Sequence, residues 1–375
     1  MTVVDPESLV AESSILVACG TGGVGKTTVA AALALHGARR GRRACVVTVD
    51  PAKRLADALG IESLGNTPKL IDGTWPGELS AMMLDTKGTF DDLVRRYSLT
   101  PDQARAIVDN RLYRNISSAL SGTQEYMAME KLYELHDSGE FDLIVVDTPP
   151  TRHALDFLEA PNRLTRFLDN RIFRLLIMPT RAYLRAVSSA TNAFLRTVSR
   201  VVGTEVVSDV IAFFEAFEGM EAGFRDRAAS VRQLLGAPET AFVLVTSPRP
   251  DAVEEASFFA ERLAEGHIAV ALLVINRLYP DFGAHAAAGS AAWAGAGAAG
   301  SGAGAAGAGP TTPLAALRRN LADFRRVAAE EEANFASLAA RLAPAPVSRV
   351  PFLPDDVHDL DGLAIVARHL MAAPT

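Results

Sequence analysis

The chain has 375 residues and a formal net charge of −7, and 49% of its residues are hydrophobic. This length allows one large α/β domain or two modest ones, and the acidic balance disfavours non-specific binding to nucleic acid or anionic lipid, since both depend on excess Lys and Arg. Residues 1–14 lack the positive stretch and apolar run of an export signal, and the longest strongly apolar stretch, Ile268 to Ile275, is far below the roughly 20 residues of a membrane span. We expect a cytoplasmic protein without a nucleic-acid partner.

Short apolar runs rich in β-branched residues recur along the chain and are typical of strands buried on both faces of a parallel sheet. The predicted extended segments are Ser14–Cys19, Ala44–Val49, Phe141–Val146, Ala241–Val245, Ala269–Ile275 and Val347–Pro354. Helical patterns separate them, so the order is βαβα and the expected fold class is doubly wound α/β with a mostly parallel sheet. We expect one such domain across residues 1–375.

A phosphate-binding motif follows the first predicted strand. Its sequence satisfies G-x-x-x-x-G-K-[ST] and precedes a helical pattern at Val29 to Arg39, which is the context that the P-loop requires. Backbone N–H groups of such a loop turn inward around phosphate oxygens, the Lys reaches the β- and γ-phosphates, and the hydroxyl of the last residue binds Mg²⁺. The expected nucleotide-binding residues are Gly20, Thr21, Gly22, Gly23, Val24, Gly25, Lys26, Thr27 and Thr28.

Two aspartates end predicted strands near this motif. Asp147 closes FDLIVVD, where a carboxylate holds the metal of a P-loop site, usually through water. Asp50 lies in VTVDPAKRLADAL, where it is placed to orient or deprotonate the attacking water, so Asp50 and Lys26 are the expected catalytic residues. The alternative for either aspartate is a helix cap, and for Asp50 that helix begins at Pro51.

Three segments together resemble the ArsA-type ATPases: GTGGVGKTT from Gly20, VDPAKRLADALG from Val49 and VVDTPPTRHALDFLEAP from Val145. This family contains the arsenite-pump ATPase and the factor that delivers tail-anchored membrane proteins, and it is related to ParA, MinD and the nitrogenase iron protein. The resemblance implies an ATPase that uses ATP and Mg²⁺, works as a dimer and has two nucleotide switches in the second and third segments. It also implies that Asn276 and the backbone at Val350 to Leu353, including Pro351, frame the adenine.

The chain departs from the family pattern in three places. Thr21 stands where family members generally have Lys, so the chain cannot donate that cation to a partner subunit, and we expect a heterodimer with a related subunit that retains the Lys. Arg152 is a possible substitute that keeps a homodimer as the alternative. The family's zinc-binding cysteine pair is replaced by a cysteine-free Gly/Ala stretch, so no zinc is expected. Cys19 and Cys45, the chain's two cysteines, lie in predicted strands and are expected to be inert core thiols, which disfavours arsenite transport.

Two stretches between the strands have helical patterns, Thr89 to Leu135 and Pro161 to Leu235. In the second, apolar residues recur at helical spacing and include Phe194 and Phe213. These faces either pack against the sheet and one another, or form an apolar surface for a client or partner. Residues 283–310 are low-complexity Gly/Ala and predict a flexible loop, and a long charged helix is predicted at Pro313 to Leu342.

The favoured function is an ATP-driven dimeric switch that couples nucleotide state to binding of a protein or lipid client or a membrane partner. A ParA- or MinD-like positioning ATPase is a second class, which the acidic charge and the lack of a basic amphipathic helix at the C-terminus disfavour. A further alternative is a weakly active regulatory subunit of a heterodimeric ATPase, because Thr21 replaces the lysine of the family. A small-molecule kinase would need an acceptor-binding pocket, and the sequence reveals none.

Overall fold

The computed structural model describes residues 5–50, 52–111, 113, 123–149, 209, 212–213, 216, 219–280 and 313–372. The predicted Gly/Ala loop at 283–310, most of the predicted insert at 161–235, and Arg152 and Phe194 lie outside the described residues.

The described part of the chain forms an eight-stranded sheet with the strand order β3-β4-β2-β5-β1-β6-β7-β8. Every neighbouring pair is parallel except β3 and β4, which are antiparallel. The strands are β1 (Ile15–Cys19), β2 (Arg43–Thr48), β3 (Lys69–Leu70), β4 (Glu78–Met83), β5 (Leu143–Asp147), β6 (Thr240–Thr246), β7 (Val270–Leu278) and β8 (Val347–Pro351). The predicted fold class, a mostly parallel α/β sheet with a P-loop, is confirmed.

Burial of the central strands explains why the sequence predicted them. All five residues of β1 and all five of β5 are buried, because helices cover both faces of a parallel sheet, and such strands are continuously apolar. The sequence did not predict β3 or β4. The β4 sequence, ELSAMM, has no β-branched residue, and β3 is a two-residue exposed edge strand.

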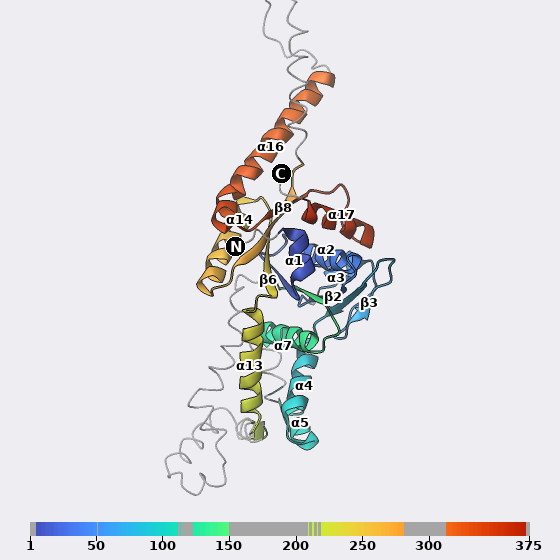
Figure 1. Ribbon diagram of the computed structural model, residues 1–375, viewed down its shortest axis with the longest axis vertical. Helices are drawn as coiled ribbons and strands as arrows, with labels where there is room; N and C mark the ends of the chain where they lie inside the picture. Colours follow the sequence, from blue (N-terminus) through green and yellow to red (C-terminus); the bar gives the residue numbers. More distant parts are fainter. Residues whose placement is uncertain are drawn as a thin grey trace, which may run out of the picture.

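Helices form a layer on each face of the sheet (Figure 1). One layer packs on the side chains of Leu16 and Ala18, and the other on those of Ile15, Val17 and Cys19. The first layer contains α1 (Pro6–Glu12), α2 (Lys26–Arg39), α3 (Arg54–Leu59) and α17 (Leu360–Met371). The second contains α7 (Thr123–Asp137), α13 (Glu221–Leu235), α14 (Pro250–Glu265) and the end of α16 (Pro313–Leu342). The order of layers is therefore α/β/α.

A group of helices extends from the second layer, away from the sheet. Helices α4 (Thr86–Tyr97) and α5 (Pro101–Val108) run beside α13, and α7 crosses between them and the sheet (Figure 1). Arg227 of α13 donates to Glu130 of α7 at 2.6 Å; the Glu130 side chain is 1% exposed and that of Arg227 is 10% exposed. Phe213 is 6% exposed and Met220 is 1% exposed, so at these two positions the packing interpretation of the apolar pattern holds. The division of the chain into an ATPase domain with inserts stays a prediction.

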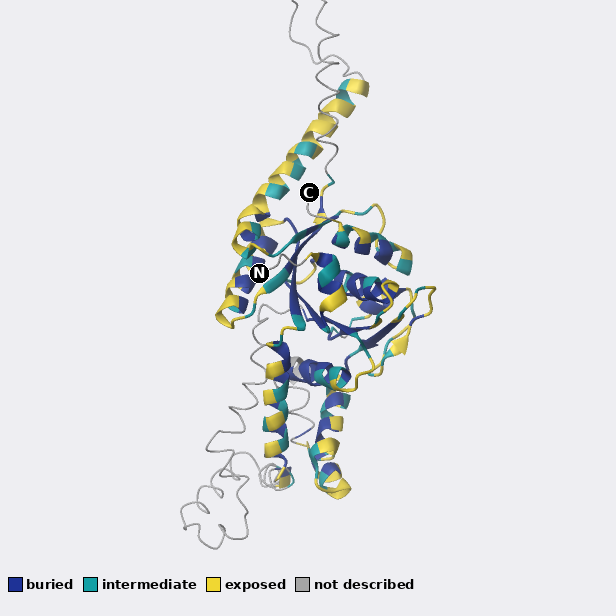
Figure 2. Cartoon of the chain, in the orientation of Figure 1, coloured by how far each residue is buried: buried dark blue, intermediate teal, exposed yellow. Residues whose placement is uncertain are grey.

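Helix α16 has the bounds that the sequence predicted and extends well beyond the body of the molecule (Figure 1). Phe335 and Leu338 near its end are buried, whereas the part farther from the sheet is largely exposed (Figure 2). In the ranges that the structure describes, no helix combines the length and the apolar character needed to span a membrane.

Candidate functional site

The predicted P-loop connects β1 to α2, and its backbone takes a form that requires glycine. Gly20, Gly23 and Gly25 have φ angles of 142°, 79° and 92°, a region that side chains disfavour. A Cβ on Gly20 would overlap the carbonyl of Val245, and one on Gly25 would overlap the side chain of Asn276. The loop is therefore a cradle held closely against neighbouring strands, which suits the close approach of phosphate oxygens to backbone N–H groups.

Lys26, the first residue of α2, keeps its ammonium group inside this loop. The residue is 6% exposed, and its Nζ donates to the carbonyl oxygen of Thr21 at 2.8 Å. Burial lowers the pKa of Lys26; the charge of Asp147 opposes this effect, and that of Arg54 adds to it. A buried ammonium with one backbone partner favours an anion close by, so Lys26 fits a bound phosphate.

Asp147 lies at the end of β5, where the P-loop and β2 meet it. Thr27 donates to its Oδ2 at 2.7 Å and Thr48 donates to the same oxygen at 2.9 Å. Asp147 is 1% exposed, and its Oδ1 has no hydrogen-bond partner among the described residues. Burial raises the pKa of the carboxyl, whereas the two threonine hydroxyls act to lower it.

The arrangement of Asp147 and Thr27 fits a magnesium ion. Mg²⁺ prefers oxygen ligands and binds through one or two carboxylates, waters and substrate phosphates instead of a cage of protein groups. Within the described ranges no cluster of three or more His, Cys, Asp or Glu could hold a metal alone. The Thr27 hydroxyl and the unpartnered Oδ1 of Asp147 belong to neighbouring side chains. Together they offer the oxygen ligands of a site that protein and phosphate share.

Asp50 follows β2, and both of its carboxylate oxygens are engaged. Oδ1 accepts from the backbone N–H of Ala52 at 3.0 Å, and Oδ2 accepts from Arg54 at 2.9 Å. The first contact holds the turn before α3 and is not a helix cap, because α3 begins at Arg54, its N-cap residue is Lys53, and no side chain makes a capping hydrogen bond there. The pair with Arg54 was not predicted, and the signal for it is the i,i+4 spacing of the two residues.

Asn276 and Pro351 come from the other side of the sheet, at the ends of β7 and β8. Asn276 is buried and donates from Nδ2 to the carbonyl oxygen of Val24 at 2.8 Å, so this side chain supports the P-loop itself. The next residue, Arg277, has a φ of 61° and donates to the carbonyl oxygen of Gly23 at 3.2 Å. The sequence did not single out Arg277, whose backbone conformation is uncommon for a residue with a side chain.

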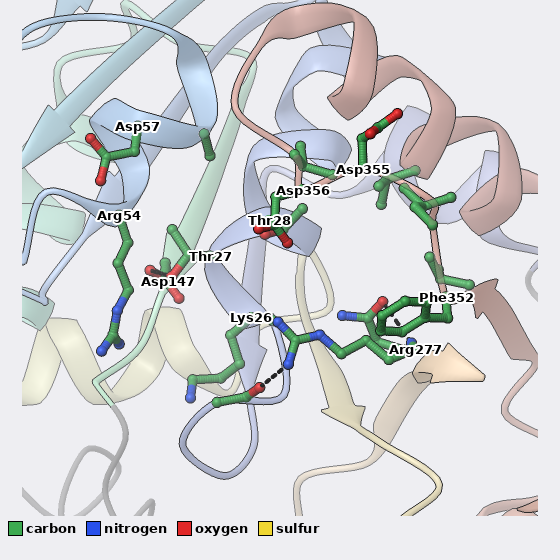
Figure 3. A pocket seen from close by; sticks show the side chains of 18 of the residues that line it. Lys26, Thr27, Thr28, Arg54, Asp57, Asp147, Arg277, Phe352, Asp355 and Asp356 are labelled. Carbon is green, nitrogen blue, oxygen red and sulfur yellow. Dashed lines mark hydrogen bonds between the residues drawn. The ribbon is translucent and has the colours of Figure 1, made fainter. Parts of the chain in front are cut away.

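Most of the predicted site residues line one cavity of about 500 Å³ (Figure 3). Of the predicted set it includes Gly23, Gly25, Lys26, Thr27, Thr28, Asp50, Asp147, Asn276 and Pro351. A second cavity, of about 560 Å³, is lined by Thr21, Gly22 and Val24 together with Gly23. The exposed Phe352 borders both. The structure thus gathers the predicted residues around the P-loop, with Lys26 lining the first cavity and Thr21 the second.

The two cysteines lie in the sheet next to this site but away from solvent. Both are buried, and burial raises the pKa of each thiol to about 12. Cys19 donates from Sγ to the carbonyl oxygen of Val243 at 3.3 Å. The prediction that both are core thiols is confirmed.

The proteins to which this chain is similar are described as ATPases. Residues 13–294 match the family model described as "Anion-transporting ATPase". The chain is 33% identical to "ATPase get3" of Aspergillus terreus over 150 residues, which is 40% of this chain and 43% of that protein. It is 26% identical over 261 residues to "ATPase GET3" of Phaeosphaeria nodorum, covering 69% of this chain and 74% of the relative. The same identity and length relate it to "ATPase GET3" of Paracoccidioides lutzii, with 71% of that relative covered.

Proposed function

The chain belongs to the family of anion-transporting, ArsA-type ATPases, and on this basis we propose that its P-loop cavity binds ATP with Mg²⁺, hydrolyses it, and thereby switches a dimer between two states. One observation carries the proposal. Thr27 and Asp147 meet at 2.7 Å beside Lys26, and the second oxygen of Asp147 is buried without a partner in the described part of the chain. A buried carboxylate in this state is costly, and a cation shared with phosphate offsets the cost.

Each residue of the cavity has a distinct role in this proposal. The P-loop N–H groups and Lys26 bind the β- and γ-phosphates. Mg²⁺, when bound, supplies positive charge to phosphate oxygens, and Thr27 directly and Asp147 through water would hold it. Asn276 in β7 and Pro351 in β8 lie across β1 from Asp147 in the strand order. There they would border the adenine base of ATP.

Asp50 is the proposed catalytic carboxylate. In hydrolysis the oxygen of a water molecule bonds to the γ-phosphorus, and the bond from that phosphorus to the oxygen shared with the β-phosphate breaks. The products are ADP and phosphate. Asp50 orients this water and accepts the proton that it loses. Its two present partners, Ala52 and Arg54, belong to its own segment, so this role requires that one oxygen be released.

Thr21 bears on the composition of the dimer. The residue lines the second cavity and carries no charge, so this chain cannot send a lysine from that position to a partner's phosphates. A heterodimer with a related subunit that has the lysine would contain one well-activated site and one poor site. The variant Thr21→Lys tests this scheme. If the working enzyme is a heterodimer, the unmodified chain alone should hydrolyse ATP slowly and Thr21→Lys should raise that rate, whereas brisk hydrolysis by the unmodified chain alone, lost in Arg152→Ala, would reject the heterodimer.

In the proposed dimer, the helices that extend from the sheet bind and release a hydrophobic client. The client is a protein, a lipid or a membrane protein. Support comes from the position of these helices, since α7 links this group to β5 and hence to Asp147 (Figure 1).

The experiment compares the unmodified protein with Asp50→Asn, which should retain ATP. With MgATP, Asp50→Asn should accumulate as a dimer and co-purify with client, whereas with ADP it should not. An oligomeric state and a set of co-purified molecules that do not depend on nucleotide would reject the switch.

A further inference from the structure

Arg54 contributes a largely exposed positive charge to the nucleotide cavity. Of the described residues that line this cavity, Lys26, Arg54 and Arg277 are the cationic ones. Lys26 is buried in the P-loop, and Arg277 is held by the carbonyl of Gly23 on the side of β7. The Arg54 side chain is 63% exposed, and its partner is another side chain, Asp50, at 2.9 Å. The Asp50 side chain is 14% exposed, but the exposed guanidinium stays in contact with water, which weakens the pair and lets the arginine exchange partners.

Arg54, the first residue of α3, lies at the end of the cavity where Asp147 lies. Arg54 follows β2, which pairs with β5, and β5 carries Asp147. Arg277 and Asn276 come from β7, on the opposite side of β1. In Figure 3 the Arg54 side chain lies on the side of Thr27 and Asp147, whereas Arg277 lies on the other side of Lys26. A triphosphate that begins at the P-loop and shares a metal with Asp147 therefore has its last phosphate on the Arg54 side.

We propose that, when ATP fills the cavity, Arg54 leaves Asp50 and binds the γ-phosphate oxygens, and so supplies from within this chain the positive charge that Thr21 of a second copy of the chain cannot provide. The inference rests on the proposed function and names a further catalytic residue for it. The planar guanidinium matches phosphate oxygens with two parallel hydrogen bonds. A triphosphate also carries more negative charge than the single carboxylate with which it competes.

The same movement releases Asp50. In the structure Oδ2 of Asp50 accepts from Arg54, and Oδ1 accepts from the N–H of Ala52. Transfer of the guanidinium to phosphate leaves Oδ2 available for the water molecule. Arg54 thus couples the arrival of the γ-phosphate to the readiness of the carboxylate, and ADP, which lacks that phosphate, leaves the pair in place.

The test measures binding as well as turnover in Arg54→Ala and Arg54→Lys. Arg326→Ala is the matched control, because Arg326 is 64% exposed and forms an i,i+4 pair with Glu330 at 2.9 Å, far from the cavity. Affinities for ADP and for a non-hydrolysable ATP analogue are measured with Mg²⁺ by calorimetry. We expect Arg54→Ala to weaken binding of the analogue about tenfold and of ADP less than about twofold, as loss of one ion pair to phosphate implies.

Turnover should fall roughly a hundredfold or more in Arg54→Ala, since a cation of this kind in cis contributes strongly to phosphoryl transfer. Arg54→Lys should recover much of the affinity for the analogue but little of the turnover, because an ammonium lacks the two-pronged geometry. Arg326→Ala should match the unmodified protein. Melting temperatures of all three variants identify any loss of folding, and Arg54→Lys still decides the case if Arg54→Ala does not fold.

Two results would overturn the inference alone: an Arg54→Ala variant that keeps the preference for the analogue over ADP, or one that hydrolyses ATP faster, in which case Arg54 only restrains Asp50. A third result, failure of the unmodified protein to bind either nucleotide, would overturn the proposed function and this inference with it.

Discussion

Thr27 donates its hydroxyl proton to Asp147 at 2.7 Å although the two residues are 120 positions apart in the chain. The contact follows from the sheet. Strands β1 and β5 are parallel neighbours, Ala18 pairs with Asp147, and the P-loop that follows β1 returns Thr27 to the same edge. Parallel strands bring their carboxyl ends together, and in open α/β sheets this edge is where ligands bind.

Replacing Asp147 tests the magnesium role. In Asp147→Asn the side-chain oxygen can still accept from Thr27 and Thr48, so we expect the variant to fold. It should lose the negative charge that holds the ion through water, and the gain in ATP affinity on adding Mg²⁺ should shrink by about tenfold or more. Titration of an ATP analogue with and without Mg²⁺ measures this gain. An undiminished magnesium effect in Asp147→Asn would assign the ion to other groups.

Replacing Asp50 separates a catalytic role of this residue from a structural role in the turn before α3. Asp50→Asn can still accept from the Ala52 N–H, so the turn should persist and ATP binding should stay within about threefold of the unmodified value. Hydrolysis should slow by about a hundredfold or more, because the amide cannot accept the proton. Phosphate release at saturating MgATP checks this. If turnover is unchanged, Asp50 only holds the turn before α3 and another group orients the water.

The apolar pattern of the helical region is tested at Phe213, which is 6% exposed. A carboxylate at this position would be buried without a partner, so Phe213→Asp should lower the free energy of unfolding by about 3 kcal/mol or more. Leu99, in the bend between α4 and α5, is 77% exposed, and Leu99→Asp should leave the melting temperature unchanged. A Phe213→Asp protein that melts normally but loses its co-purified client would instead place Phe213 on the client surface.

The thiols give a prediction about pH and about metalloid chemistry. Burial raises the pKa of Cys19 and of Cys45 to about 12, and the thiolate is the reactive form. The folded protein should therefore react negligibly with a thiol reagent at pH 8, and raising the pH to 9 should add little, because both values lie below that pKa. Both thiols should react after unfolding in denaturant. Arsenite should leave ATP turnover unchanged, and fast labelling of the folded protein would contradict this reading.

The parts of the fold that the sequence predicted are those in which local pattern and burial agree. The β1 and β5 segments are continuously apolar because both faces are covered, and the P-loop glycines mark positions where a Cβ would collide with Val245 or Asn276. Strand β4 was not predicted because its residues have low intrinsic strand preference. Its pairing with β2 is a tertiary contact that no local sequence pattern encodes.

Contacts between distant or flexible side chains were beyond sequence reasoning for a different reason. The approach of Asn276 to Val24 spans 252 positions and depends on how β7 is aligned with the P-loop. The pair of Asp50 and Arg54 is local, but an i,i+4 spacing shows only that two charges can meet. Whether that arginine lines a cavity depends on the position of α3 over the sheet.

The most direct test of the account is phosphate release from MgATP by the purified chain alone, measured beside Lys26→Ala from the same preparation. Lys26 is the buried cation of the P-loop, so its removal should eliminate turnover by this chain while leaving any contaminating activity untouched. The account predicts measurable release by the unmodified protein and none above background by Lys26→Ala. Equal release by the two proteins would mean that the cavity around Lys26, Thr27 and Asp147 is not where ATP is hydrolysed.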